Sequence, residues 1–369
     1  MTKIINFAKK NAVMLIAAFA AIVTSFIVPP DREYIDYFDF KTLTCLFSVL
    51  AVVGALRNIR FFYTLAKAII RRFRNTKLCI LVLVYITFIG SMLIANDMAL
   101  LTFLPLGYFV LHTTGKEKYM AFTFIMQNIA ANLGGMLTPF GNPQNLYIYS
   151  KFNIPDLEFI KIMFPPFIVA VVLITVCCLV FVRTEPLIIE EKAASLPIPR
   201  VIIYLLLFAL SIIIVFKFIP YQIGLIVIPT ALFFLDRRAL IELDYGLLLT
   251  FVFFFIFSGN MARIDEVRNF FSFLLEKNTL VFSALSCQFI SNVPSAILLS
   301  QFTDNYKELL LGVNIGGAGT MIASLASLIT FREYSKQDPG HTLRYIIKFS
   351  IFNFTFLLIL IVFCLIFEV

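Results

Sequence analysis

Long apolar runs separated by short polar segments dominate the chain. A helix needs about 20 apolar residues to cross the hydrocarbon core of a bilayer, so runs of this length predict membrane-spanning helices. The runs are residues 11–28, 40–56, 157–183, 200–217, 219–235, 245–262 and 342–367. The pattern predicts an all-α polytopic membrane protein.

Two further regions are apolar but interrupted in the middle by polar residues. Residues 78–111 are broken at Asn96 and Asp97, and residues 279–303 are broken around Asn292. A chain that enters the membrane, turns at a polar tip and returns to the same side has this pattern. We therefore expect each region to form a re-entrant helical hairpin.

Glycine-rich polar breaks interrupt two more segments, 119–150 and 309–331. Backbone at bilayer depth must be satisfied internally unless it lines a cavity. We expect these segments to be broken transmembrane helices. The chain then has nine spans and two hairpins.

The basic segments predict the orientation, because cytoplasmic loops carry an excess of Lys and Arg. The acidic loop 31–39 is expected outside the cell membrane, with the N-terminus cytoplasmic and the C-terminus external. The stretch 57–76 should lie along the membrane surface. The segments assigned to the cytoplasm contain Lys3, Lys9, Lys10, the arginines of 57–77, Arg237, Arg238 and the loop 332–336.

Composition supports a membrane protein and excludes other classes. Hydrophobic residues make up 60% of the 369 residues and charged residues 14%, against about 45–50% and 25% in soluble domains. The net charge of +8 comes from clusters beside apolar runs, which argues against nucleic-acid binding. The two histidines and six cysteines have no metal or catalytic spacing, so no enzymatic activity and no resident cofactor are expected.

The chain matches itself in the order and identity of its polar and glycine positions. The pairs are Asp39 with Asp244, Gly54 with Gly259, Asn96 with Asn292, Asn132 with Asn314, and Thr138 with Thr320. Five crossings separate equivalent spans, so the second copy should be inverted, an architecture that recurs in transporters. We expect a first repeat at 1–183, a linker with a connecting helix at 184–218, and a second repeat at 219–369.

The hairpin tips and helix breaks are the candidate substrate- and ion-binding site. Broken helices expose free N–H groups suited to anions and free carbonyls suited to cations, and glycines leave both groups accessible. Asn, Ser and Thr side chains would add neutral polar groups. The candidates are Asn96, Asp97, Asn132, Gly134, Gly135, Thr138, Gly141, Asn142, Asn145, Ser291, Asn292, Asn314, Gly316, Gly317 and Thr320.

Asp97 lies in the middle of an apolar segment, where an ionised carboxylate is costly and usually functional. It could bind Na⁺, together with Asn96, Ser291 and Asn292, or carry a proton. The structural alternative is a carboxylate that only caps a helix. Simpler readings also exist for Asn142 and Asn145 as turn residues, and for Thr138 and Thr320 as hydroxyls bonded within their own helix.

The run Asn132-Leu-Gly-Gly-Met-Leu-Thr-Pro-Phe-Gly-Asn-Pro-Gln-Asn145, with the tips Ala95-Asn96-Asp97 and Ser291-Asn292-Val293-Pro294, resembles the ion transporter superfamily. This group includes divalent anion/sodium symporters, arsenite efflux pumps and NhaD-type sodium/proton antiporters. The chain looks closest to the citrate-transporter-like permeases, and the resemblance covers about 39–330. It implies two inverted repeats, each with a hairpin, and elevator-type transport.

The tips depart from the Ser-Asn-Thr signature of the dicarboxylate symporters. Ser291 and Asn292 match two of its residues, Val293 replaces the threonine, and the other tip carries Asp97. The added negative charge argues against a dicarboxylate and favours the arsenite and sodium/proton branches.

These patterns together predict a secondary transporter of a small ion or anion, coupled to H⁺ or Na⁺. The alternatives are a cation/proton antiporter or an arsenite-type efflux permease and, from a different class, an ion channel with similar pore-lining groups. The expected partners are the lipid bilayer, a small ionic substrate and, in a homodimer, a second copy of the chain.

Overall fold

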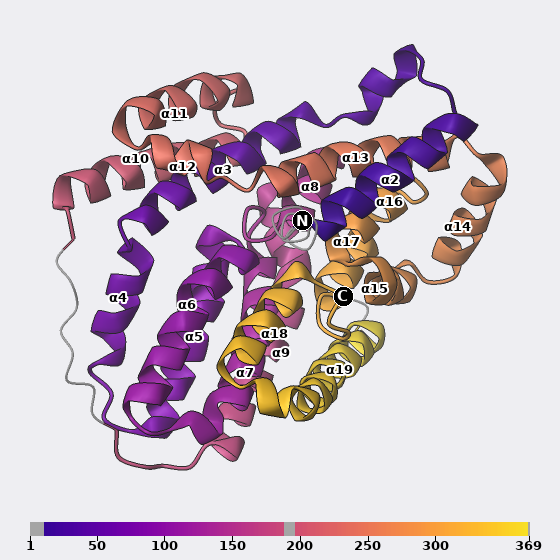
Figure 1. Ribbon diagram of the computed structural model, residues 1–369. Helices are drawn as coiled ribbons and strands as arrows, with labels where there is room; N and C mark the ends of the chain where they lie inside the picture. Colours follow the sequence, from indigo (N-terminus) through magenta and orange to yellow (C-terminus); the bar gives the residue numbers. More distant parts are fainter. Residues whose placement is uncertain (1–10, 188–195, 368–369) are drawn as a thin grey trace.

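The computed structural model describes residues 11–187 and 196–367, and these residues are almost entirely helical (Figure 1). Lys3, Lys9, Lys10 and part of the predicted linker lie outside the described residues. An isolated β-bridge joins Asn75 to Pro186. The prediction of an all-α polytopic membrane protein is confirmed.

The helices before the predicted linker follow the expected order. The elements are α2 (Ala12–Ile27), η1 (Arg32–Tyr37), α3 (Phe40–Asn58), α4 (Phe61–Ile70), α5 (Thr76–Ile94), α6 (Asn96–Thr113), η2 (Glu117–Tyr119), α7 (Met120–Gly134), η3 (Gly135–Leu137), α8 (Pro143–Lys151) and α9 (Asp156–Phe181).

The remaining helices repeat much of this order. They are α10 (Ile198–Val215), α11 (Tyr221–Leu235), α12 (Arg237–Ile241), α13 (Tyr245–Ala262), α14 (Asp265–Lys277), α15 (Thr279–Ile290), α16 (Asn292–Leu299), α17 (Tyr306–Ile315), α18 (Leu325–Gln337), η4 (Pro339–His341) and α19 (Thr342–Phe367).

Among the described residues, six helical segments are long and apolar enough to cross a membrane. One of them is α5, a 19-residue helix that forms the first arm of the predicted hairpin. Shorter apolar helices include α2, α11 and α15. Their outward faces carry large apolar side chains such as Phe26, Phe234 and Phe289, which water would not favour and lipid would cover.

The two interrupted apolar regions form helix pairs, and each turn is a single residue. Ala95 joins α5 to α6 with φ 65°, and Ser291 joins α15 to α16 with φ 75°. Positive φ is uncommon for residues with a β-carbon. The matching backbone at both tips shows that the sequence repeat is also a repeat of local structure.

Contacts between the two copies are reciprocal. Helix α2 packs on α13 while α11 packs on α3, and α6 packs on α18 while α16 packs on α8. Figure 1 shows the α5–α6 pair and the α15–α16 pair on either side of α7, α8, α17 and α18. Exchange of equivalent elements is what a pseudo-twofold relation between two copies produces. The inverted orientation of the copies in a bilayer stays a prediction.

The arginine-rich stretch 57–76 is more deeply packed than a helix lying on a membrane surface. Arg57 belongs to the last turn of α3, and α4 packs on α3, α5 and α6. Lys67 of α4 is only 8% exposed, and its ammonium lies 4.7 Å from the centre of the Phe109 ring. Interhelical packing as well as amphipathicity therefore fixes α4.

Candidate functional site

The breaks after α7 and α17 lie against the first arms of the two hairpins. A β-carbon on Gly134 would collide with the Phe88 carbonyl oxygen of α5. On Gly316 it would lie 2.9 Å from the Ala284 Cα of α15. Glycine is needed at both positions because the backbones approach too closely for any side chain.

Two equivalent threonines, one at each break, bond the break to the neighbouring hairpin. The Thr138 hydroxyl donates to the Met92 carbonyl oxygen at 2.7 Å, and the Thr320 hydroxyl donates to the Gln288 carbonyl oxygen at 3.0 Å. Met92 and Gln288 lie in the last turns of α5 and α15, where carbonyls lack partners within the helix. The threonines thus bond across elements, not within their own helices.

Asn132 links the first tip to the second break. Its Oδ1 accepts from Asn96 Nδ2 at 3.2 Å and from the Ser324 hydroxyl at 2.8 Å. All three side chains are buried. Because Ser324 comes from the other copy, Asn132 joins the two halves near the hairpin tip.

Asn314, the equivalent of Asn132, also bonds the other copy. Its Oδ1 accepts from Asn142 Nδ2 and Gln144 Nε2, both at 3.3 Å. Its Nδ2 donates to Asn145 Oδ1 at 2.6 Å. Asn142 occupies the position in the first copy that Ser324 has in the second, so the two connections are pseudo-symmetric. The amides of both copies form one buried network.

Asn145 holds the first break in shape. Its Nδ2 donates to the carbonyl oxygens of Gly135, Met136 and Thr138 at 3.1–3.2 Å. These bonds go beyond a simple turn, because they satisfy carbonyls that the broken helix leaves free. Its remaining polar atom bonds Asn314, which makes Asn145 a positioning residue.

Gln288 performs the corresponding task at the second break. Its Nε2 donates to the carbonyl oxygens of Gly316 and Ala318 at 2.9 and 3.3 Å, and its Oε1 accepts from the Thr320 N–H at 2.8 Å. The first copy has Met92 at this position, so the sequence repeat did not indicate it. Gln288, Gln144 and Ser324 are the members of the network that the sequence analysis missed.

The asparagines of the tips have matching local geometry. Asn96 Oδ1 accepts from the Asp97 N–H at 2.9 Å, and Asn292 Oδ1 accepts from the Val293 N–H at 2.9 Å. Asn292 also approaches the network. A β-carbon on Gly317 would lie 3.3 Å from Asn292 Nδ2 and 3.6 Å from Asn132 Oδ1.

Other predicted site residues support this arrangement. Gly141 lies against the Gly135 carbonyl and the Thr138 hydroxyl. The Ser291 hydroxyl donates to Asn292 Oδ1 at 3.3 Å and to the Ala323 carbonyl at 3.4 Å. The structure therefore brings Asn96, Asn132, Asn142, Asn145, Asn292 and Asn314 together, with the glycines and threonines around them.

The Asp97 carboxylate does not cap a helix among the described residues. Asp97 is the second residue of α6, and its carboxylate accepts no hydrogen bond from the first turn of that helix. Its Oδ1 is buried without a hydrogen-bond partner. A carboxylate oxygen in this state is suited to a proton or a hard cation such as Na⁺, and the oxygens of Asn96, Ser291 and Asn292 are of the same chemical kind.

Three buried amide atoms of the network also lack hydrogen-bond partners: Asn132 Nδ2, Asn142 Oδ1 and Gln144 Oε1. Most buried polar atoms in folded proteins are hydrogen-bonded, so each exception calls for an explanation. One donor and two acceptors in one network suit a small molecule that both donates and accepts hydrogen bonds. The named network contains no Lys, Arg or His.

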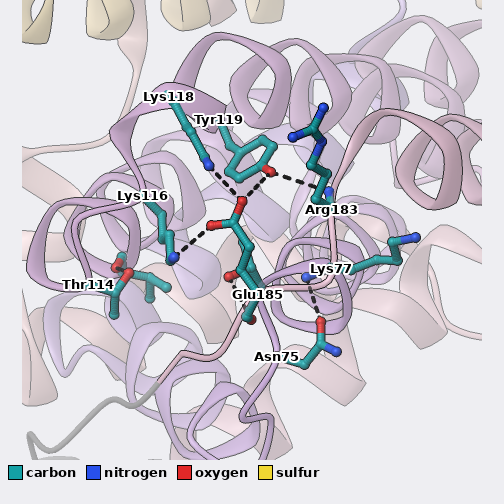
Figure 2. Close-up of polar contacts among 10 residues, drawn as sticks. Asn75, Lys77, Thr114, Lys116, Lys118, Tyr119, Arg183 and Glu185 are labelled. Atoms are coloured by element: carbon teal, nitrogen blue, oxygen red, sulfur yellow. Dashed lines mark hydrogen bonds and ion pairs between the residues drawn. The ribbon is translucent and has the colours of Figure 1, made fainter.

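Ion pairs stabilise the first hairpin at the end away from its tip, where α5 begins and α6 ends (Figure 2). The Glu185 carboxylate pairs with Lys116 at 2.7 Å and Lys118 at 2.6 Å, and it accepts from the Tyr119 hydroxyl at 3.0 Å. Its carbonyl oxygen accepts from the Thr76 N–H at the start of α5. These bonds hold the pKa of Glu185 low, at about 2, with the Lys116 bond as the largest cause.

Two cavities flank the second arms of the hairpins. A cavity of about 430 Å³ beside α6 is lined by Arg57, Arg60, Phe62, Tyr63, Leu101, Thr102 and Pro105. A cavity of about 810 Å³ just past the end of α16 includes Tyr147, Lys151, Gly259, Arg263 and Gln301 in its lining.

Paired hairpins, broken helices and a buried amide network are typical of polytopic membrane transporters. A family model described as citrate transporter matches residues 2–306. The chain belongs to this citrate transporter family.

Individual relatives agree with this assignment. An uncharacterized transporter of Methanocaldococcus jannaschii is 32% identical over 81% of this chain and 82% of its own length. The inner membrane protein YbiR of Escherichia coli is 27% identical over 84% of each chain. The silicon efflux transporter LSI3 of Oryza sativa subsp. japonica is 28% identical over 38% of this chain and 28% of its own length.

Proposed function

We propose that this protein is a secondary active transporter that moves a small ion or anion and is coupled to H⁺ or Na⁺. One observation carries the proposal. The tips and breaks of both copies meet in a buried amide network in which Asn132, Asn142 and Gln144 each keep an unpaired polar atom. A substrate that pairs these atoms would be bound between the two copies.

Asp97 is the proposed coupling group. It is adjacent to Asn96, which bonds Asn132 directly, so a cation or proton at Asp97 would act on the network through one residue. An occupied carboxylate stabilises the tip, whereas an empty ionised one is costly at this depth. This difference gives the physical basis for coupled transport.

An elevator movement accounts for the distribution of contacts. Each hairpin is tied to its break by a threonine bond, so the hairpin and the broken helix of one copy would move together.

The network also supports an alternative substrate class. Amide groups without a cationic side chain suit an uncharged hydroxylated acid, as in an arsenite-type efflux permease. The relative LSI3 is a silicon efflux transporter by name. A cation/proton antiporter is the other alternative that Asp97 supports.

Gradient-driven flux in proteoliposomes tests the proposal. The purified chain is reconstituted, and uptake of radiolabelled anions, Na⁺ and undissociated oxyacids is measured with and without imposed pH and Na⁺ gradients. The expected result is saturable uptake against the substrate gradient that collapses with an ionophore. Flux that only follows the substrate gradient and does not saturate would indicate a channel.

A further inference from the structure

The cavity of about 430 Å³ beside α6 lies outside the amide network and has a charge of one sign. Arg57 and Arg60 are its charged lining residues, and no carboxylate lines it. Arg57 donates to the Met98 sulfur at 3.5 Å, a weak partner for a guanidinium. Within the described part of the chain, neither arginine forms an ion pair.

Arg60 lines the cavity from an unusual backbone conformation. Arg60 joins α3 to α4 in the left-handed conformation, with φ 56°. Glycine would adopt this conformation with less strain. An arginine at this position lines the cavity at the expense of backbone strain.

Other groups at the cavity also favour an anionic ligand. Phe62 and Tyr63 come from the first turn of α4, a ten-residue helix without a side-chain cap. The N-terminus of a helix carries a partial positive charge and free N–H groups. The Tyr63 hydroxyl makes no hydrogen bond to the described residues and could donate to a ligand.

We propose that this cavity binds a phosphate-type oxyanion. Arginine guanidinium groups match the oxygens of phosphate with paired, charge-assisted hydrogen bonds. Two sources have this chemistry: a free anion from solution and the headgroup of an anionic phospholipid. The cavity is open enough for either, and the site is separate from the transport network.

The test uses the purified full-length chain and matched pairs of substitutions. Thermal unfolding is followed while inorganic phosphate replaces chloride at constant ionic strength. A second arm compares nanodiscs of phosphatidylcholine with nanodiscs that contain phosphatidylglycerol. The cavity variant is Arg57→Gln with Arg60→Gln, and the control is Arg71→Gln with Arg72→Gln, which removes two exposed charges outside the cavity.

The cavity variant is expected to bind roughly tenfold or more weakly than the control. Stabilisation by phosphate alone identifies a soluble anion, and stabilisation by phosphatidylglycerol alone identifies a lipid headgroup. Either result supports the site. The proposal would be overturned if the cavity and control variants lost ligand-induced stabilisation equally. It would also be overturned if neither arm showed saturable stabilisation. If the double variant does not fold, Arg60→Gln carries the test, because this side chain is exposed.

Discussion

The two hairpin tips share a backbone but differ in chemistry. Both turn at one residue with positive φ, and both place an asparagine oxygen 2.9 Å from the next N–H group. The next residue is Asp97 in the first tip and Val293 in the second. The backbone of the tip is therefore duplicated, whereas a carboxylate, with its Oδ1 buried, follows the asparagine only in the first tip.

The two helix breaks differ in the element that supports them. The first break is held by Asn145 from within its own loop, and the second is held by Gln288 from the hairpin. Equivalent loops can thus be stabilised from different elements, because an unpaired carbonyl needs a donor irrespective of its origin. Substitutions at equivalent positions separate the shared scaffold from the groups that belong to one copy.

The largest effect is expected for Asp97→Asn, which keeps the shape and removes the charge. Loss of a charged ligand group is worth roughly tenfold or more in apparent affinity for a coupling cation. The apparent affinity is measured from transport rates in proteoliposomes as a function of Na⁺ concentration and pH. Val293→Asn is the matched control at the other tip and should retain the dependence. An unchanged Na⁺ and pH dependence in Asp97→Asn would exclude Asp97 as the coupling group.

Asn314→Ala should destabilise the protein by about 2–3 kcal/mol, because it leaves the buried amides of Asn142, Gln144 and Asn145 with fewer partners. Chemical unfolding in detergent measures the change. Asn132→Ala, at the equivalent position, should cost less, since one polar atom of Asn132 already lacks a partner. A larger loss for Asn132→Ala would contradict the network described here.

The threonine ties should behave alike in the two copies. Thr138→Val and Thr320→Val each remove one hydrogen bond to a helix-end carbonyl and should cost about 1 kcal/mol. Unfolding measurements on both variants check this symmetry. The double variant should show additive losses, because the two bonds have no shared partner. Strong non-additivity would mean that the breaks are coupled through the network.

The smallest effect is expected for Glu185→Gln at the base of the first hairpin. The base of the second hairpin has a comparable carboxylate, because Glu308 accepts from the Leu280 N–H at the start of α15. The low pKa of Glu185 means that its stabilisation is complete above about pH 4.5 and is lost as the pH falls toward about 2. The melting temperature of the variant should lie below that of the wild type at pH 7, and the two should approach each other in acid. A difference that does not depend on pH would assign the effect to packing.

The lengths of the apolar runs and the polar residues that interrupt them predicted much of the fold. Apolar length predicted the long helices α3, α9, α10, α13 and α19, whereas the runs 11–28 and 219–235 form the shorter helices α2 and α11. The polar interruptions at Asn96 and Asn292 lie within one residue of the two turns. Glycine pairs located the breaks after α7 and α17. These features are local, because a bilayer requires each segment to satisfy its own backbone.

The pairing of the polar groups was decided only by the tertiary structure. Asn132 meets Ser324 and Asn314 meets Asn142 because the two copies exchange contacts, and no periodicity within either copy specifies that exchange. Gln288 supports the second break although its equivalent, Met92, offers only a backbone carbonyl. The sequence by itself determined which residues could be polar at membrane depth. Folding determined which of them satisfy one another and which keep an unpaired atom, because a hydrogen bond depends on distances between segments far apart in the chain.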